Sequence, residues 1–114
     1  MTEYLGSRAY EILARGNLFP TTVRERVVAV GATAVEVAPT NPRRVSMTVV
    51  NQGANPVYLS FDTSLVPTSG VWLSANGGSL VMTVAEDLEA TTWLLYAACP
   101  AATVNVYVLE IVAL

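Results

Sequence analysis

The chain of 114 residues contains no histidine, no lysine and a single cysteine, Cys99. The lack of histidine excludes Ser-His-Asp and Cys-His catalytic groups and imidazole zinc sites. The lack of lysine excludes Schiff-base chemistry and a phosphate-binding P-loop. One cysteine forms neither an internal disulfide nor a thiolate cage, so we expect Cys99 to be a small buried apolar residue.

Charge is also scarce. Charged residues make up 13% of the chain and apolar residues 53%, and that charged share is about half the usual value for a soluble domain. Because a domain of this size has a thin core, much apolar surface remains after folding. Either Thr, Ser, Asn and Ala dominate the exposed surface, or another subunit covers part of it. We favour the second interpretation.

The few charges are unevenly distributed along the sequence. All six basic residues are arginines within the first 44 residues, whereas residues 45–114 carry five acidic residues and no basic one. An acidic body argues against nucleic acid as the main ligand. The arginines are either plain surface residues or part of a basic N-terminal arm that docks on an acidic neighbour.

Residues 1–20 differ in composition from the rest and are expected to form an N-terminal arm, either as a short helix or as an extended segment. This segment does not have the pattern of a secretory signal. No apolar run in the chain reaches the roughly 18 residues of a membrane span, so we expect no membrane partner.

From Val23 onward the apolar residues recur with a period of two, which is typical of strands. We expect about eight short strands, in residues 23–30, 33–37, 45–50, 57–61, 71–73, 80–84, 92–98 and 103–112. Residues 33–37 are expected to pair with the first strand, and residues 57–61 with the strand before them.

The turns are predicted from their glycines. Gly53 is expected to adopt a positive φ, and Gly77-Gly78 to form a hairpin. In residues 103–112 both faces are apolar, which favours a central strand or one that contacts a partner. The pattern predicts an all-β fold: a single antiparallel β-sandwich or jelly-roll-like domain over residues 21–114.

The sequence offers three candidate sites. Glu86, Asp87 and Glu89 lie in a polar loop and could supply the two carboxylates of a glycoside hydrolase, but we favour the interpretation that they are solvated loop residues. The same residues with Asp62 lack the spacing of a calcium loop, so no metal and no cofactor is predicted. The aromatic residues are candidates for a sugar-binding platform: Tyr58, Trp72, Trp93, Tyr96 and Tyr107. Trp72 is the best exposed candidate, and Trp93 with Leu95 is expected in the core.

The stretch RVSMTVVNQGANPVYLSFD, residues 44–62, resembles a pattern of small tailed-bacteriophage virion proteins. In that pattern a strand that ends in Asn-x-Gly leads into Asn-Pro-Val-Tyr, and the later pieces match residues 68–70, 73, 77–80 and 95–97. The resemblance covers residues 43–110 and does not include the arm. It implies a structural role as a capsid decoration (cement) protein on the capsid surface, or as a minor head-neck or tail component, and it implies a symmetric oligomer, with a trimer favoured.

On this reading the protein is a non-enzymatic virion protein that reinforces the capsid shell through several simultaneous contacts. Its partners are the major capsid protein or other virion subunits. The partner-binding residues predicted are those of the arm, with packing against the chain's own body as the equal alternative: Tyr4, Leu5, Arg8, Tyr10, Ile12, Leu13, Arg15 and Phe19. A carbohydrate- or receptor-binding module near Trp72, and a two-carboxylate hydrolase, are the alternatives from other classes.

Overall fold

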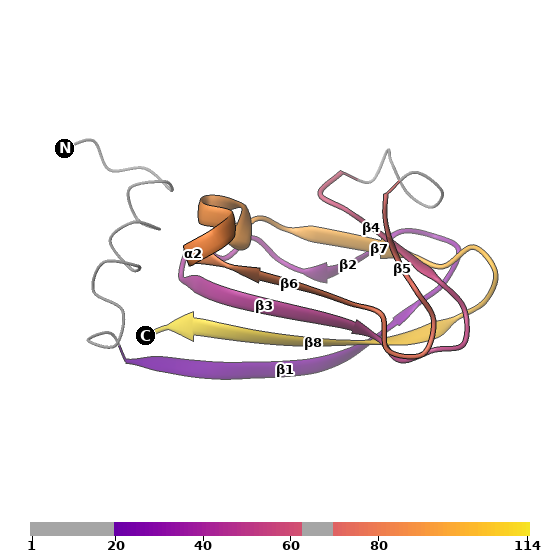
Figure 1. The fold of residues 1–114 in the computed structure, drawn as a ribbon, viewed down its shortest axis with the longest axis horizontal. Helices are drawn as coiled ribbons and strands as arrows, with labels where there is room; N and C mark the ends of the chain where they lie inside the picture. Colours follow the sequence, from indigo (N-terminus) through magenta and orange to yellow (C-terminus); the bar gives the residue numbers. More distant parts are fainter. Residues whose placement is uncertain (1–19, 63–69) are drawn as a thin grey trace.

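The computed structural model describes residues 20–62 and 70–114, and these form two antiparallel sheets that pack face to face (Figure 1). The first sheet has the strand order β1-β8-β3-β6 and the second β2-β7-β4-β5. The strands are β1 (Thr21–Val30), β2 (Val35–Ala38), β3 (Arg44–Asn51), β4 (Val57–Ser60), β5 (Val71–Leu73), β6 (Ser79–Thr83), β7 (Leu95–Ala98) and β8 (Val104–Ala113). Eight strands in this double-sheet order make a jelly roll, which confirms the predicted fold class.

The pairing of the strands differs from the sequence prediction. Among the described strands, only β4 and β5 are both consecutive in the chain and paired with each other. Residues 33–37 were expected to pair with β1, but β2 pairs with β7. Likewise β4 does not pair with β3, and the Gly77-Gly78 turn joins strands of different sheets. Glycine turns show where the chain reverses, but they do not show whether the next strand joins the same sheet or crosses to the other.

The core lies between the two sheets and is built from the alternating residues of each strand. From the first sheet, Met47, Val49, Val106 and Val108 are fully or almost fully buried. Strand β8 lies between β1 and β3, so the prediction that the last strand is central is confirmed. Cys99 is also fully buried in this core, as expected.

One end of the sandwich is tied together by Asn51, which is fully buried. Its side-chain amide donates to the carbonyl oxygens of Asn55 and Ser74, at 2.8 and 3.1 Å. Its Oδ1 accepts the N–H of Gly53 at 3.0 Å. The loop after β3 and the turn after β5 are therefore held by one side chain, which explains the asparagine two residues before the glycine.

Gly53 itself does not have the positive φ that was expected; among the described residues, positive φ occurs at Asn76, Gly77 and Leu88. A Cβ atom on Gly53 would lie 2.3 Å from Cβ of Val104. This glycine is required because the chain passes close to β8, and not because of its backbone angle.

The connection between β6 and β7 contains a short helix, α2 (Val84–Asp87), and a 3₁₀ turn, η2 (Leu88–Thr92). Oγ1 of Thr83 accepts the N–H of Glu86 at 3.3 Å, and Oδ2 of Asp87 accepts the N–H of Thr83 at 3.0 Å. This reciprocal arrangement is an N-terminal helix cap. The segment predicted as a polar loop therefore contains a short helix. No helix in the described ranges has the length and apolar character needed to cross a membrane.

Candidate functional site

The solvent side of the β1-β8-β3-β6 sheet carries several apolar side chains. We call this surface the outer face; it is formed by the residues of these four strands that alternate with the core residues. Its apolar members are Val23, Val27, Val50, Val81, Tyr107, Leu109 and Ile111, and the polar members between them are mostly Ser and Thr.

The strand register brings these residues into continuous rows across the sheet. Leu109 of β8 lies between Glu25 of the edge strand β1 and Thr48, and Thr48 lies opposite Val81 of the edge strand β6. In the next row, Tyr107 lies between Val27 of the other edge strand and Val50. The rows place apolar side chains on all four strands, so the patch extends from one edge of the sheet to the other.

The apolar side chains of the two edge strands are largely exposed: Val23, Val27 and Val81 have exposed fractions of 57%, 56% and 57%. Those of the two central strands, such as Leu109, are half-buried. Apolar patches of this kind on a small domain mark interaction sites. The outer face is therefore the first candidate for a functional surface.

Glu25 is the one charged residue that the described strands place on the outer face. It lies on the edge strand β1, and its Oε1 accepts the hydroxyl proton of Tyr107 at 2.6 Å. This hydrogen bond raises the pKa of Tyr107 above its ordinary value, because the donated proton is held by a carboxylate. The face thus offers a partner little charge to recognise.

The second notable group is a buried ion cluster between the sheets, formed by Arg44, Glu110 and Arg26. Arg44 is completely buried and Glu110 is 2% exposed. Nε of Arg44 donates to Oε1 of Glu110 at 2.5 Å, and its Nη2 pairs with the same oxygen. Nη1 of Arg26 donates to Oε2 of Glu110 at 2.7 Å. Both carboxylate oxygens are therefore satisfied.

The remaining guanidinium protons of this cluster bind backbone carbonyls of the opposite side of the sandwich. Nη1 of Arg44 donates to Thr91 and Trp93, both at 3.1 Å, and Nη2 donates to Pro39. Arg26 donates to the carbonyl of Val37 from Nε and Nη2, at 3.0 and 2.6 Å. The cluster holds β1, β3 and β8 to the segments around β2 and η2. Its role is to close this end of the fold.

The electrostatics follow from the burial and the pairing. Desolvation lowers the pKa of Arg44, in spite of the opposing attraction of Glu110. Burial alone would raise the pKa of Glu110, but the hydrogen bond from Arg26 and the charge of Arg44 outweigh it, and the pKa is lowered. The glutamate is thus ionised at neutral pH, as a structural anion.

This cluster corrects the sequence interpretation of the charges. The arginines were expected to be either plain surface residues or part of a basic arm that docks on a neighbour, but Arg26 and Arg44 are engaged inside their own domain. A signal was present in the sequence. Glu110 occupies the position where the alternation of Val104, Val106 and Val108 calls for another core residue, and a carboxylate there requires a buried cation.

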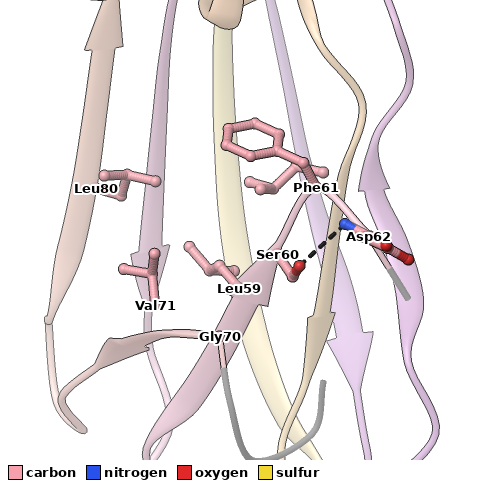
Figure 2. A pocket seen from close by; sticks show the side chains of 8 residues that line it. Leu59, Ser60, Phe61, Asp62, Gly70, Val71 and Leu80 are labelled. Atoms are coloured by element: carbon pink, nitrogen blue, oxygen red, sulfur yellow. Dashed lines mark hydrogen bonds between the residues drawn. The ribbon is translucent and has the colours of Figure 1, made fainter. Parts of the chain in front are cut away.

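An apolar pocket of about 360 Å³ lies at the edge of the sandwich where β5 and β6 separate (Figure 2). Leu59, Val71 and Leu80 project toward this space from β4, β5 and β6, and Phe61 lies above it. The polar side chains in its lining are Ser60 and Asp62, and Oγ of Ser60 accepts the N–H of Asp62 at 2.9 Å. The pocket suits an apolar group rather than a polar substrate.

The acidic candidates are not brought together at this pocket. Asp62 contributes to its lining, but Glu86, Asp87 and Glu89 lie in α2 and η2 and are not among the lining residues. In the described part of the chain, no group of three or more Asp, Glu or Cys side chains is placed to hold a metal ion.

The aromatic candidates separate into two groups. Trp72 of β5 lies directly opposite Tyr58 of β4, and its exposed fraction of 57% confirms the prediction that it is exposed. Tyr96 of β7 lies one diagonal step from Tyr58 on the same side of the second sheet. Trp93 was expected in the core, but it is 41% exposed and packs edge-on against Phe61 at 5.5 Å between ring centres. Leu95 is buried, as expected.

Trp93 was misplaced because it follows η2 and precedes β7, so the strand alternation does not yet apply to it. The predicted partner-binding residues of the arm, Tyr4 to Phe19, lie outside the described residues.

Comparisons with known proteins add little. No family model and no curated protein matches the chain. A solved structure from Bacillus endospore appendages, which form a family of disulfide-linked pili, is similar over 83% of this chain and 91% of that chain, with 18% identity and a TM-score of 0.43. This similarity is too low to carry an argument about function.

Proposed function

We propose that this chain is a non-enzymatic structural subunit that is buried in a larger assembly through its outer face. The observation that carries the proposal is the apolar patch that continues across all four strands and contains one charged residue. Leaving such a surface in water costs about 25 cal/mol per Å² of apolar area. A neighbouring subunit that covers it gains this free energy, and a small protein without such a partner risks aggregation.

The assembly we propose is the virion of a tailed bacteriophage, with the chain as a capsid decoration protein on the outside of the shell. The support for this finer proposal is the resemblance of residues 43–110 to small virion proteins. The arm, residues 1–20, then provides the contacts to the major capsid protein, and several copies in one assembly add their weak contacts. A minor head-neck or tail component is the alternative position in the same particle.

Co-sedimentation with purified particles tests this function. The full chain, a chain without residues 1–18 and a chain with Val81→Glu on the outer face are each mixed with particles that lack the protein, and the bound fraction is measured. We expect the full chain to bind and the arm deletion to bind at least tenfold more weakly, with unchanged circular dichroism. Full binding of the arm deletion would contradict the role of the arm, and absence of binding by the full chain would contradict the virion assignment.

The exposed Trp72 beside the half-buried Tyr58 favours a second candidate function, a carbohydrate- or receptor-binding module. Two adjacent aromatic rings on an open sheet surface offer an apolar platform for a sugar ring, and Tyr hydroxyls add hydrogen-bonding groups. A glycan array tests it, with Trp72→Ala as the variant that should lose at least tenfold in signal. An array with no signal above background would contradict this function and leave the structural one intact.

A further inference from the structure

We infer that the partner which covers the outer face is a second copy of this chain, and that the two sheets pack face to face about a two-fold axis. The inference rests on the proposed function in one respect, because it names the neighbour at the surface that the proposal uses.

The area of the face meets the lower requirement of a stable dimer. The four strands contain ten, ten, eight and five residues. At about 4.8 Å between strands and about 3.3 Å per residue, they cover roughly 500 Å² of plane. Two copies therefore bury about 1,000 Å² or more, which is the smallest area of a specific interface. Interfaces at this lower limit belong to the weak, transient class, so we expect the pair to dissociate in the micromolar range.

The charge distribution permits two identical faces to meet. A two-fold axis parallel to the strands places β1 of one copy over β6 of the other, so that the two Glu25 side chains lie at opposite edges. Three strand spacings separate these edges by about 14 Å, which exceeds the screening length of about 8 Å at physiological salt. Each carboxylate also keeps its hydrogen bond to Tyr107 in its own copy. At the centre of the interface Leu109 and Thr48 are uncharged, and Glu25 borders Leu109 from the edge strand β1.

Edge-to-edge pairing of β1 is the competing way for two copies to associate, because β1 is a ten-residue edge strand. If β1 of one copy pairs antiparallel with β1 of a second copy, about a two-fold axis perpendicular to the sheet, the central registers place Glu25 opposite Glu25, or Arg24 opposite Arg24. Like charges directly opposite each other destabilise a strand pair. Charged residues in the middle of an edge strand are also a common protection against such pairing. The face, and not the edge, is therefore the favoured contact.

The same packing already occurs inside the molecule, where the first sheet packs on the second through Val, Leu and Met side chains. Aligned sheets about 10 Å apart are the usual solution for two twisted apolar faces.

A dimer also presents two arms on one body, and this doubles the contacts available to a shell. The two-fold pair differs from the trimer that the resemblance implies, so the mass of the assembly distinguishes them.

Sedimentation equilibrium of the full chain, from about 1 to 200 µM, tests the inference across the micromolar range. Val81→Glu places a charge on the outer face at a site that is 57% exposed, and Trp72→Glu is the matched control on the solvent side of the other sheet, at a site that is also 57% exposed. We expect a reversible dimer for the wild type and for Trp72→Glu, and at least tenfold weaker association for Val81→Glu. Leu109→Glu, at the centre of the face, should give the same loss, and circular dichroism verifies that each variant is folded.

Three outcomes would overturn the inference: a wild-type monomer at 200 µM, a dimer that Val81→Glu and Leu109→Glu leave unchanged, or a trimer. Each of these results is independent of the particle assay. A monomer that still binds particles would refute the dimer and retain the virion function, whereas a dimer that binds no particle would retain the inference and refute the virion assignment.

Discussion

At the scale of single residues, Glu110 has the most demanding environment in the described structure. Its carboxylate is buried between two guanidinium groups and is the only acid in contact with Arg44 among the described residues. A buried ion pair is not by itself a large source of stability, but removal of one partner leaves an uncompensated charge. The cluster should therefore be sensitive to any change that removes the charge of Glu110.

We expect Glu110→Gln to lower the free energy of unfolding by about 3 kcal/mol, because Arg44 would remain buried without its anion. Urea unfolding followed by circular dichroism measures the change. Glu36→Gln is the control at an exposed position of β2, and it should change stability by less than about 0.5 kcal/mol. Equal effects of the two substitutions would show that the cluster does not support the fold.

The lowered pKa of Glu110 also sets a pH dependence. A carboxyl whose pKa is lower in the folded state binds its proton more readily when unfolded, so it stabilises the fold above its ordinary pKa. This contribution is complete above about pH 5 and is lost as the pH falls below about 4.3 and through the folded pKa. Urea midpoints between pH 7 and pH 3 should fall more steeply for the wild type than for Glu110→Gln. Parallel curves would contradict this assignment.

At the scale of residues, the sequence correctly predicted the burial or exposure of two single side chains. Cys99 was expected to be buried and Trp72 exposed, and both are. The ion cluster was missed because Arg26, Arg44 and Glu110 are far apart in the sequence, and only the strand register brings them together. The alternation alone would have marked Glu110 as an inward residue, but it does not name the partner.

At the scale of elements, the connection between β6 and β7 contains a local strain. Leu88, at the junction of α2 and η2, has φ 52° and ψ −132°, a conformation that non-glycine residues rarely adopt. Such a residue costs of order 1 kcal/mol or more, and the surrounding structure must hold it. Its side chain is 40% exposed, so little packing depends on it.

We expect Leu88→Gly to stabilise the domain by about 1 kcal/mol, since glycine accepts this backbone conformation without a steric cost. For a domain of this size, the midpoint of thermal unfolding should rise by about 4 °C. Leu88→Ala is the control, because it removes the same side chain but keeps the Cβ atom, and it should give no increase. A lower midpoint for Leu88→Gly would show that the leucine side chain supports the fold more than its backbone strains it.

Element prediction was sound for the existence and approximate bounds of the strands and unsound for their pairing. Period-two alternation is a local property, so it is visible in residues 45–50 and 103–112 without any knowledge of the fold. Pairing depends on which sheet each connection reaches. The connections after β1, β3 and β5 all cross between sheets, and a glycine turn is compatible with both a hairpin and a crossing.

At the scale of the whole molecule, composition was informative about the surface. A small charged share predicted exposed apolar area, and the structure places part of that area on the outer face and part around Val71, Trp72 and Trp93. The sequence could not locate the outer face, because its residues come from four strands and alternate with core residues of the same chemical kind. Val81 and Met82 are neighbours in the chain, yet the first is exposed and the second buried.

The central claim is that the outer face is covered when the protein is assembled, and the reactivity of a thiol placed there tests it most directly. Cys99 is fully buried, so the thiol of Val81→Cys should dominate alkylation, and Trp72→Cys provides the control on the second sheet. In the assembled full chain we predict that the thiol at position 81 reacts at least tenfold more slowly than after dilution to about 1 µM, where a micromolar complex dissociates. The thiol at position 72 should react at one rate in both states, and equal rates for position 81 would contradict the account.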